Sequence, residues 1–456
     1  MENEFNVQKK YNTMKNYLYT PNNGNQEKSI LKKVTFKLKS KTLLLIFLLF
    51  FIAEPGLQAY PIDGYLITGI RRLVRLHLIL NGEIKDAQPI SGAKKKISEI
   101  KLQLENEKGD SLVAIPKSDP ILQKYVNNLF PNLDESYSIS LLEITPNKKI
   151  RYASRQENKG FQPGSVGKLA VIAGLFSELE RLYPDSFEKR QQLLRSKFVR
   201  AGRWAMTDEH TVPFFNPETK DFFKRTVRED DVFSLYEWAD HMLSVSNNGA
   251  ASVVWRELVL MRQFGDEYPL LTESQADEFF KTTPKAILQK LAVLVVNEPL
   301  QSIGIEENEW RLGSMFTQGA KSIIPGSGGS IGSPQALMKY LIALERGKIV
   351  DHNSSLEIKR LLYMTDRRIR YATSPRLTNA AVYFKSGSLY QCKKEEGFSC
   401  KKYMGNVQNY MNSVAIIEHP DGTVYLVALM SNVLRKNSNI DHLVLATEID
   451  DIIRKK

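Results

Sequence analysis

Cysteine is nearly absent from this chain of 456 residues, which has only Cys392 and Cys400. The six histidines show no HExxH or other metal-ligand spacing, so we expect neither a metal site nor a cofactor. No glycine-rich phosphate loop precedes a lysine in Walker form. Zinc-finger spacing, arginine-rich blocks and basic-aromatic sheet motifs are missing too, which argues against nucleic acid as a partner.

Long apolar runs are scarce as well. The run TLLLIFLLFFIA at 42–53 has twelve residues, fewer than the ~20 that a membrane-spanning helix needs. Residues 1–41, a basic tail, hold nine lysines and three glutamates, half of the formal net charge of +12. Residues 42–59 therefore read as a signal peptide, with an uncleaved membrane anchor as the alternative. Both place the body of the chain in the periplasm or on the outer face of the cytoplasmic membrane.

The two cysteines bracket the segment KKEEGFS. In an exported chain Cys392 and Cys400 are candidates for a disulfide that closes a small hairpin loop. Two unrelated free thiols are the alternative.

The composition, 42% hydrophobic and 25% charged, is that of a globular protein. Residues 60–118 form a juxtamembrane segment to which the sequence gives no role, and 119–456 form one domain. Its pattern predicts strands at 137–144 and 150–154, a helical middle, three strands at 380–390, 412–420 and 423–432, and a closing helix from residue 442. This predicts an α+β fold in which an antiparallel sheet is built from both ends of the domain and flanked by helices, beside an all-helical subdomain.

The stretch FQPGSVGKLAVIAGLF at 161–176 places Ser165 three residues before Lys168 at the start of a buried helix. Residues three apart on a helix share a face, so the hydroxyl and the amine can meet. A hydroxyl beside an amine is a nucleophile beside a possible base. The unpaired N–H groups of the first turn also favour an oxyanion.

Two more motifs follow in order. Ser246-Asn247-Asn248 lies at a turn-like break in helical sequence, and Lys385-Ser386-Gly387-Ser388 lies in a late strand. Each alone fits a helix cap or a solvated strand residue. Together, as SxxK, SxN and K[ST]G in this order, they are specific. Residues 119–456 thus resemble the penicillin-recognising serine enzymes, and most closely the class A β-lactamases.

The resemblance implies a β-lactamase/transpeptidase-like fold and a role for each motif residue. Ser165 would be acylated with Lys168 as base, which burial and nearby Lys385 would keep partly neutral. Ser246 would pass a proton to the departing nitrogen, and Asn248 would bond a substrate amide. Lys385 and Ser386 would bind a substrate carboxylate, and Gly387, which has no side chain, would let the substrate approach the strand closely. The backbone N–H groups of Ser165 and Ser388 would form the oxyanion hole.

The chain departs from that family where a loop glutamate should activate the deacylating water. Glu298 in NEPLQSIG precedes a proline as in that loop, but the expected asparagine is missing; Glu309 is a second candidate. We therefore expect an exported, monomeric serine hydrolase that acts on a β-lactam or a D-Ala-D-Ala-like peptidoglycan amide. A D,D-carboxypeptidase or endopeptidase, a membrane-tethered penicillin-binding sensor and a non-catalytic scaffold are the alternatives.

Overall fold

The computed structural model describes residues 59–130, 134–366 and 368–455, which lie in the compact unit Pro55–Lys456. The predicted basic tail and apolar run at 42–53 lie outside the described residues. Within the described ranges, no helix combines the length and apolar character needed to cross a membrane.

A five-stranded antiparallel sheet joins the two ends of the domain in the order β2-β1-β11-β10-β9. The central strand is β11, and in its pairing with β1 Ser138 lies opposite Met430. The α+β prediction is confirmed. The five strands are β1 (Ser138–Glu143), β2 (Arg151–Arg155), β9 (Ala381–Gln391), β10 (Gln408–Glu418) and β11 (Val424–Asn432).

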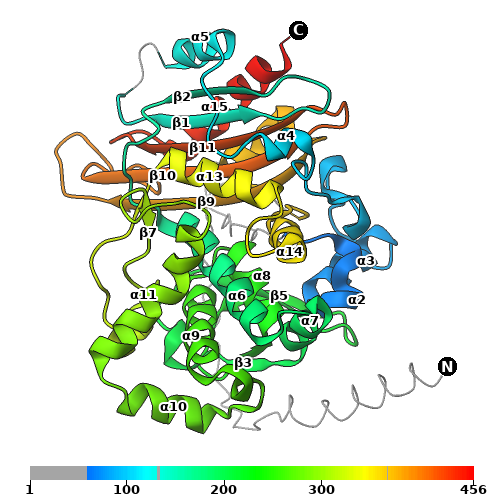
Figure 1. The fold of residues 1–456 in the computed structure, drawn as a ribbon, viewed down its shortest axis with the longest axis vertical. Coiled ribbons are helices and arrows are strands. Elements are labelled where there is room, and N and C mark those ends of the chain that lie inside the picture. Colours follow the sequence, from blue (N-terminus) through cyan, green and yellow to red (C-terminus); the bar gives the residue numbers. More distant parts are fainter. Residues whose placement is uncertain (1–58, 131–133, 367, 456) are drawn as a thin grey trace, which may run out of the picture. The chain divides into compact units, whose positions relative to one another are not determined.

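Helices cover both faces of this sheet (Figure 1). On one face α5 (Pro120–Leu129) and α15 (Ser438–Arg454) enclose a smaller apolar core that includes Leu445 and Ile449. On the other, α13 (Pro334–Glu345) packs on β1 and β11 and leads into a larger core. The strands alternate between these cores, which explains why most of their residues are apolar.

The helical subdomain lies beyond α13 and is centred on α6 (Lys168–Leu182), which packs against α9 and α11. From Leu169 to Phe176 every residue of α6 is buried, as its apolar run predicts. The other helices of the described chain are α2 (Tyr65–Thr68), α3 (Arg71–Leu80), α4 (Glu107–Asp110), α7 (Phe187–Ser196), α8 (Leu235–Leu243), α9 (Asn248–Phe264), α10 (Glu273–Thr282), α11 (Lys285–Gln301), α12 (Gln318–Ile323) and α14 (His352–Leu362).

Short strand pairs join the loops around the helices. In the segment WAMTDEHTVPFFNP, residues from Thr211 form a strand in which Phe214 stacks on Phe223 of the neighbouring strand. These short strands are β3 (Phe198–Arg200) with β6 (Val232–Ser234), β4 (Thr211–Phe215) with β5 (Phe222–Thr226), and β7 (Trp310–Arg311) with β8 (Ile331–Gly332).

Residues 60–118, expected to be a juxtamembrane segment, pack against the domain. Tyr60 is fully buried and donates from its hydroxyl to Glu357 of α14 at 2.6 Å. Arg72 of α3 is buried and bonded to both carboxylate oxygens of Asp240 of α8, with Nε–Oδ2 at 2.6 Å. An ion pair removed from water in this way ties the segment to the helical subdomain.

Candidate active site

The predicted nucleophile lies in a 3₁₀ turn, η4 (Gly164–Gly167), that runs directly into α6. Gly164 has a φ of +54°, a left-handed conformation that favours glycine. Asn412 of β10 holds the start of the turn by donating from Nδ2 to the carbonyls of Gln162 (2.9 Å) and Pro163 (3.0 Å). Ser165 is therefore presented, half-buried, at the N-terminal end of a buried helix.

The structure brings the first two motifs together at the amine of Lys168. Its Nζ donates to Ser165 Oγ at 2.9 Å, to the Ser246 carbonyl at 2.6 Å and to Asn248 Oδ1 at 2.7 Å. Ser246 Oγ lies 3.4 Å from the same nitrogen. Ser246 has a left-handed φ of +59°, and Asn247 caps α9 by accepting from the Ala250 N–H. This break between α8 and α9 turns both motif side chains towards Lys168.

The surroundings of Lys168 favour its neutral form. The side chain is fully buried. Burial lowers its pKa to about 7; the carboxylate of Asp208 opposes that shift and the guanidinium of Arg370 adds to it. A lysine with this pKa exchanges protons readily near neutrality.

The third motif completes the cluster from β9, an edge strand of the sheet. Lys385 Nζ donates to Ser246 Oγ at 2.8 Å, so the two lysines flank one hydroxyl. Burial lowers the pKa of Lys385 well below its usual value, and the charges of Lys168 and Arg370 lower it further.

Gly387 is where β9 and the nucleophile turn touch. A Cβ at residue 387 would lie 2.9 Å from Ser165 N, and one at Gly164 would lie 3.2 Å from Ser388 N. The backbone nitrogens of Ser165 and Ser388 therefore lie on either side of this contact. The sequence predicts that Gly387 lets the substrate approach the strand. In the structure, the absence of a side chain at Gly387 also makes room for the turn that carries Ser165.

Arg370, in the 3₁₀ turn η7 (Arg370–Thr373), is a site residue that the sequence analysis missed. It is buried and has a left-handed φ of +53°. Its guanidinium donates to Ser386 Oγ at 2.8 Å and to Ser388 Oγ at 3.0 Å. The two serines of the KSGS motif thus share one cation, on the opposite side of the strand from Lys385.

Asp208, in the loop before β4, is a second missed residue. Its carboxylate accepts from the backbone N–H groups of Asn248 (2.6 Å) and Gly249 (3.2 Å) and from Asn248 Nδ2 (3.3 Å). His210 Nδ1 lies 2.6 Å from Asp208 Oδ1. The sequence of this loop shows neither a regular hydrophobic period nor a motif. Its contact with the site depends on the tertiary fold.

The structure does not bring Glu298 to this cluster. Glu298 lies on α11, 38% exposed, and pairs with Arg181 at 3.2 Å and Arg262 at 2.6 Å. Arg262 also binds Glu178 of α6, which is roughly 15 Å along the helix from Lys168 at 1.5 Å per residue. The EP dipeptide predicted a loop, but Pro299 is accommodated inside the helix.

Glu309, the second candidate, pairs with Lys339 of α13 at 2.7 Å. Among the described residues, no carboxylate forms a hydrogen bond or an ion pair with Ser165 or Lys168.

Apolar side chains line one side of the cluster. The ring centroid of Phe316 lies 5.1 Å from Lys168 Nζ. Leu312 packs so closely on Gly167 that a Cβ there would lie 2.6 Å from Leu312 Cδ2. The segment from Leu312 to Phe316 thus forms an apolar wall beside the amine.

Beyond Ser388, the loop between β9 and β10 carries a disulfide between Cys392 and Cys400. Tyr403 of this loop lies against Arg370, 4.8 Å from guanidinium carbon to ring centroid. Glu395 pairs with Arg435 at 2.8 Å. The loop is thereby fixed beside β9.

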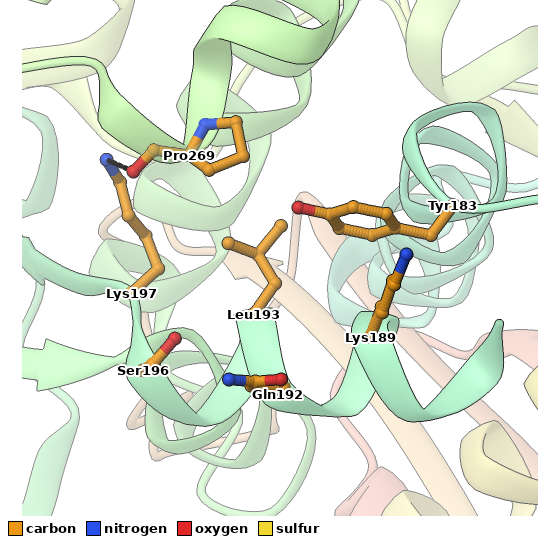
Figure 2. A pocket seen from close by; sticks show the side chains of 7 residues that line it. All are labelled: Tyr183, Lys189, Gln192, Leu193, Ser196, Lys197 and Pro269. Atoms are coloured by element: carbon orange, nitrogen blue, oxygen red, sulfur yellow. Dashed lines mark hydrogen bonds between the residues drawn. The ribbon is translucent and has the colours of Figure 1, made fainter.

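A separate surface pocket of about 360 Å³ lies on α7 (Figure 2). Lys197 at its edge donates to the Leu271 carbonyl at 2.9 Å. None of the predicted site residues lines it, so it is distinct from the catalytic cluster. The pocket is lined by Tyr183, Lys189, Gln192, Leu193, Ser196, Lys197 and Pro269.

The described ranges contain no group of three or more histidine, cysteine, aspartate and glutamate side chains that could hold a metal ion.

Known proteins resemble this chain in sequence and in fold. The model of the beta-lactamase enzyme family matches residues 121–449. A beta-lactamase from Sphaerobacter thermophilus DSM 20745 is 12% identical over 76% of this chain and 96% of its own, with a TM-score of 0.44. A PBP-A mutant in an acyl-enzyme complex with penicillin G is 13% identical over 74% and 97%, with a TM-score of 0.45. A class A beta-lactamase representative from Bacteroides cellulosilyticus DSM 14838 is 13% identical over 74% of this chain and 98% of its own, with a TM-score of 0.45. No curated relative matches the sequence.

Proposed function

The chain belongs to the beta-lactamase enzyme family of serine hydrolases, and on that premise we propose that it is a D,D-peptidase that acylates Ser165 with D-alanyl amides of peptidoglycan. β-Lactams would acylate the same serine, and the resulting acyl-enzyme would be hydrolysed slowly. The observation that carries this proposal is the contact set of Lys168, which includes the nucleophile and no carboxylate.

Acylation needs only groups that the cluster contains. Neutral Lys168 takes the proton of Ser165 Oγ as that oxygen bonds to the substrate carbonyl carbon, and the carbonyl oxygen becomes an oxyanion between the N–H groups of Ser165 and Ser388. The carbon–nitrogen bond then breaks. Ser246 Oγ, 2.8 Å from Lys385 Nζ and 3.4 Å from Lys168 Nζ, gives its proton to the departing nitrogen and regains one from Lys168.

The substrate's terminal carboxylate would bind the hydroxyl of Ser386, near two cations. Lys385 lies on one side of the strand, and Arg370 on the other bonds Ser386 at 2.8 Å. A paired cation and hydroxyl donor suit a carboxylate. This favours a substrate that ends in a free carboxylate, as a D-alanyl peptide does.

Deacylation separates the two substrate classes. Without a carboxylate beside the ester, Lys168 is the base available to a water, which must enter from the side that the leaving group occupied. A peptide's amine diffuses away and opens that space. A β-lactam's nitrogen remains tethered to the acyl group, and it therefore blocks the water's approach.

The proposal includes export to the periplasm or the outer membrane face, in line with the apolar run at 42–53. The Cys392–Cys400 disulfide supports an oxidising compartment.

The test is intact-protein mass spectrometry of the full chain after mixing with benzylpenicillin, with Ser165→Ala as control. D-Alanine release from a pentapeptide ending in D-Ala-D-Ala is followed in parallel. We expect an adduct equal to the mass of the drug that persists for many minutes, none in the control, and D-alanine release. Rapid drug hydrolysis without an adduct would indicate a β-lactamase instead. If the protein neither reacts with the drug nor releases D-alanine, both functions are ruled out.

A further inference from the structure

Asp208 lies where no motif places a functional residue, yet it holds the end of the SxN motif. Its side chain is 3% exposed, and it accepts three hydrogen bonds from Asn248 and Gly249, at 2.6, 3.2 and 3.3 Å. A buried carboxylate with this many donors is a rigid anchor. We propose that Asp208 is a positioning residue for acylation, which fixes the amide of Asn248 against the Lys168 amine and adds a negative charge to that site.

The geometry of Asn248 carries the first half of this inference. One end of its amide, Oδ1, faces the Lys168 amine at 2.7 Å, and the other, Nδ2, faces the Asp208 carboxylate at 3.3 Å. Reversing the amide would turn its oxygen towards the Asp208 carboxylate, which is repulsive, and its N–H groups towards the N–H groups with which protonated Lys168 donates. Asp208 therefore fixes the orientation, and the second Nδ2 hydrogen remains for a substrate carbonyl.

Charge carries the second half. The groups around Lys168 are the amine of Lys385 of β9, whose own pKa is lowered, the cation Arg370 of η7, the neutral Ser246 and Asn248, the ring of Phe316, and the anion Asp208. Burial and Arg370 lower the pKa of Lys168, whereas Asp208 raises it. Asp208 is itself kept ionised: burial raises its pKa, but the hydrogen bond and charge of His210, with Lys168 and the Gly249 N–H, produce a net lowering. Asp208 thus offsets part of the cationic field at the base.

Two readouts test Asp208→Asn in the full chain. The first is the pKa of Lys168, followed by the ¹³C shift of labelled lysine and assigned with Lys168→Met; it needs no substrate. The second is the pH profile of acylation by a chromogenic cephalosporin. We expect the Lys168 pKa and the acid limb of the profile to move together to lower pH. The plateau rate should fall roughly ten- to a hundredfold, as for loss of a hydrogen bond to a charged group.

Three variants separate positioning from folding. Asp231→Asn removes another mostly buried carboxylate, paired with Arg225 at 2.6 Å, and should leave the limb unchanged. Asp208→Glu keeps the charge but displaces Asn248, so it should lower the plateau without moving the limb. It also serves if Asp208→Asn does not fold. His210→Gln leaves the three N–H donors to Asp208 in place and should largely retain the plateau.

An unchanged Lys168 pKa and unchanged acylation in folded Asp208→Asn would overturn the inference. So would losses that Asp231→Asn reproduces, because these would reflect stability alone. The inference builds on the proposed function, and the two fail differently. If the wild-type protein resists all acyl donors, the proposed function fails, while the lysine titration still decides the role of Asp208.

Discussion

A Cβ on Gly387 would lie 2.9 Å from the backbone nitrogen of Ser165, closer than side-chain carbons approach nitrogen in folded proteins. Strand and nucleophile turn are therefore in backbone contact, and the two nitrogens proposed to bind the oxyanion are spaced by that contact. The separation depends on a missing methyl group, so it can be changed by adding one.

Gly387→Ala should push β9 away from η4 and lower acylation about 10²- to 10³-fold, as for loss of one oxyanion donor. Stopped-flow acylation by a chromogenic cephalosporin measures the effect. Gly329→Ala is the matched control, since a Cβ there meets nothing within 4 Å. Equal rates in the two variants would remove the β9 contact from the mechanism.

Acylation should increase with pH through about 7, because the pKa of Lys168 is lowered to about 7 and only the neutral amine accepts the proton of Ser165. Below that pH the rate should fall about tenfold per unit, since each unit leaves a tenth as much neutral amine. Lys168→Arg, which stays protonated, should abolish acylation at every pH. A pH-independent rate for the wild type, with the fold intact by circular dichroism, would exclude Lys168 as base.

Glu298→Gln should leave the lifetime of the penicillin acyl-enzyme unchanged, because Glu298 is engaged with Arg181 and Arg262 away from the cluster. The variant should lose at most about 1 kcal/mol of unfolding free energy, as for a partly exposed ion pair. Mass spectrometry and urea denaturation provide the two measurements. A much longer-lived adduct would restore Glu298 as the deacylating residue.

Arg72→Met should reduce the unfolding free energy by about 3–5 kcal/mol, because it leaves the buried carboxylate of Asp240 without its cation. This variant tests whether residues 59–118 belong to the cooperative fold. The control is Lys220→Met, which breaks an ion pair with Glu83 whose side chains are 46% and 49% exposed and should cost less than about 1 kcal/mol. Similar small losses in both would mean that the segment folds separately.

The parts of the site that could be predicted are those whose spacing is local. Ser165 and Lys168 are three residues apart and meet, although Ser165 lies in a 3₁₀ turn before the helix rather than in it. The late strands could also be predicted from the alternation of their residues.

The site residues that could not be predicted lie in irregular segments whose sequences show no helical or strand periodicity. Arg370 and Asp208 are single polar residues in irregular segments, where a solvated side chain is the usual outcome. Glu298 was misplaced for a related reason: Glu-Pro reads as a loop, but tertiary packing of α11 against α6 and α9 carries the helix through Pro299.

The pairing of β1 with β11 has a consequence for the timing of folding. During synthesis, Ser165 and Lys168 are made long before the strand that supplies Lys385, and β1 has no partner on its inner side until the segment at Val424–Asn432 is complete. Contacts so distant in sequence form slowly. A nascent chain that has not yet reached β11 therefore carries its nucleophile unassembled and inert, and the enzyme becomes reactive only once Val424–Asn432 has joined the sheet.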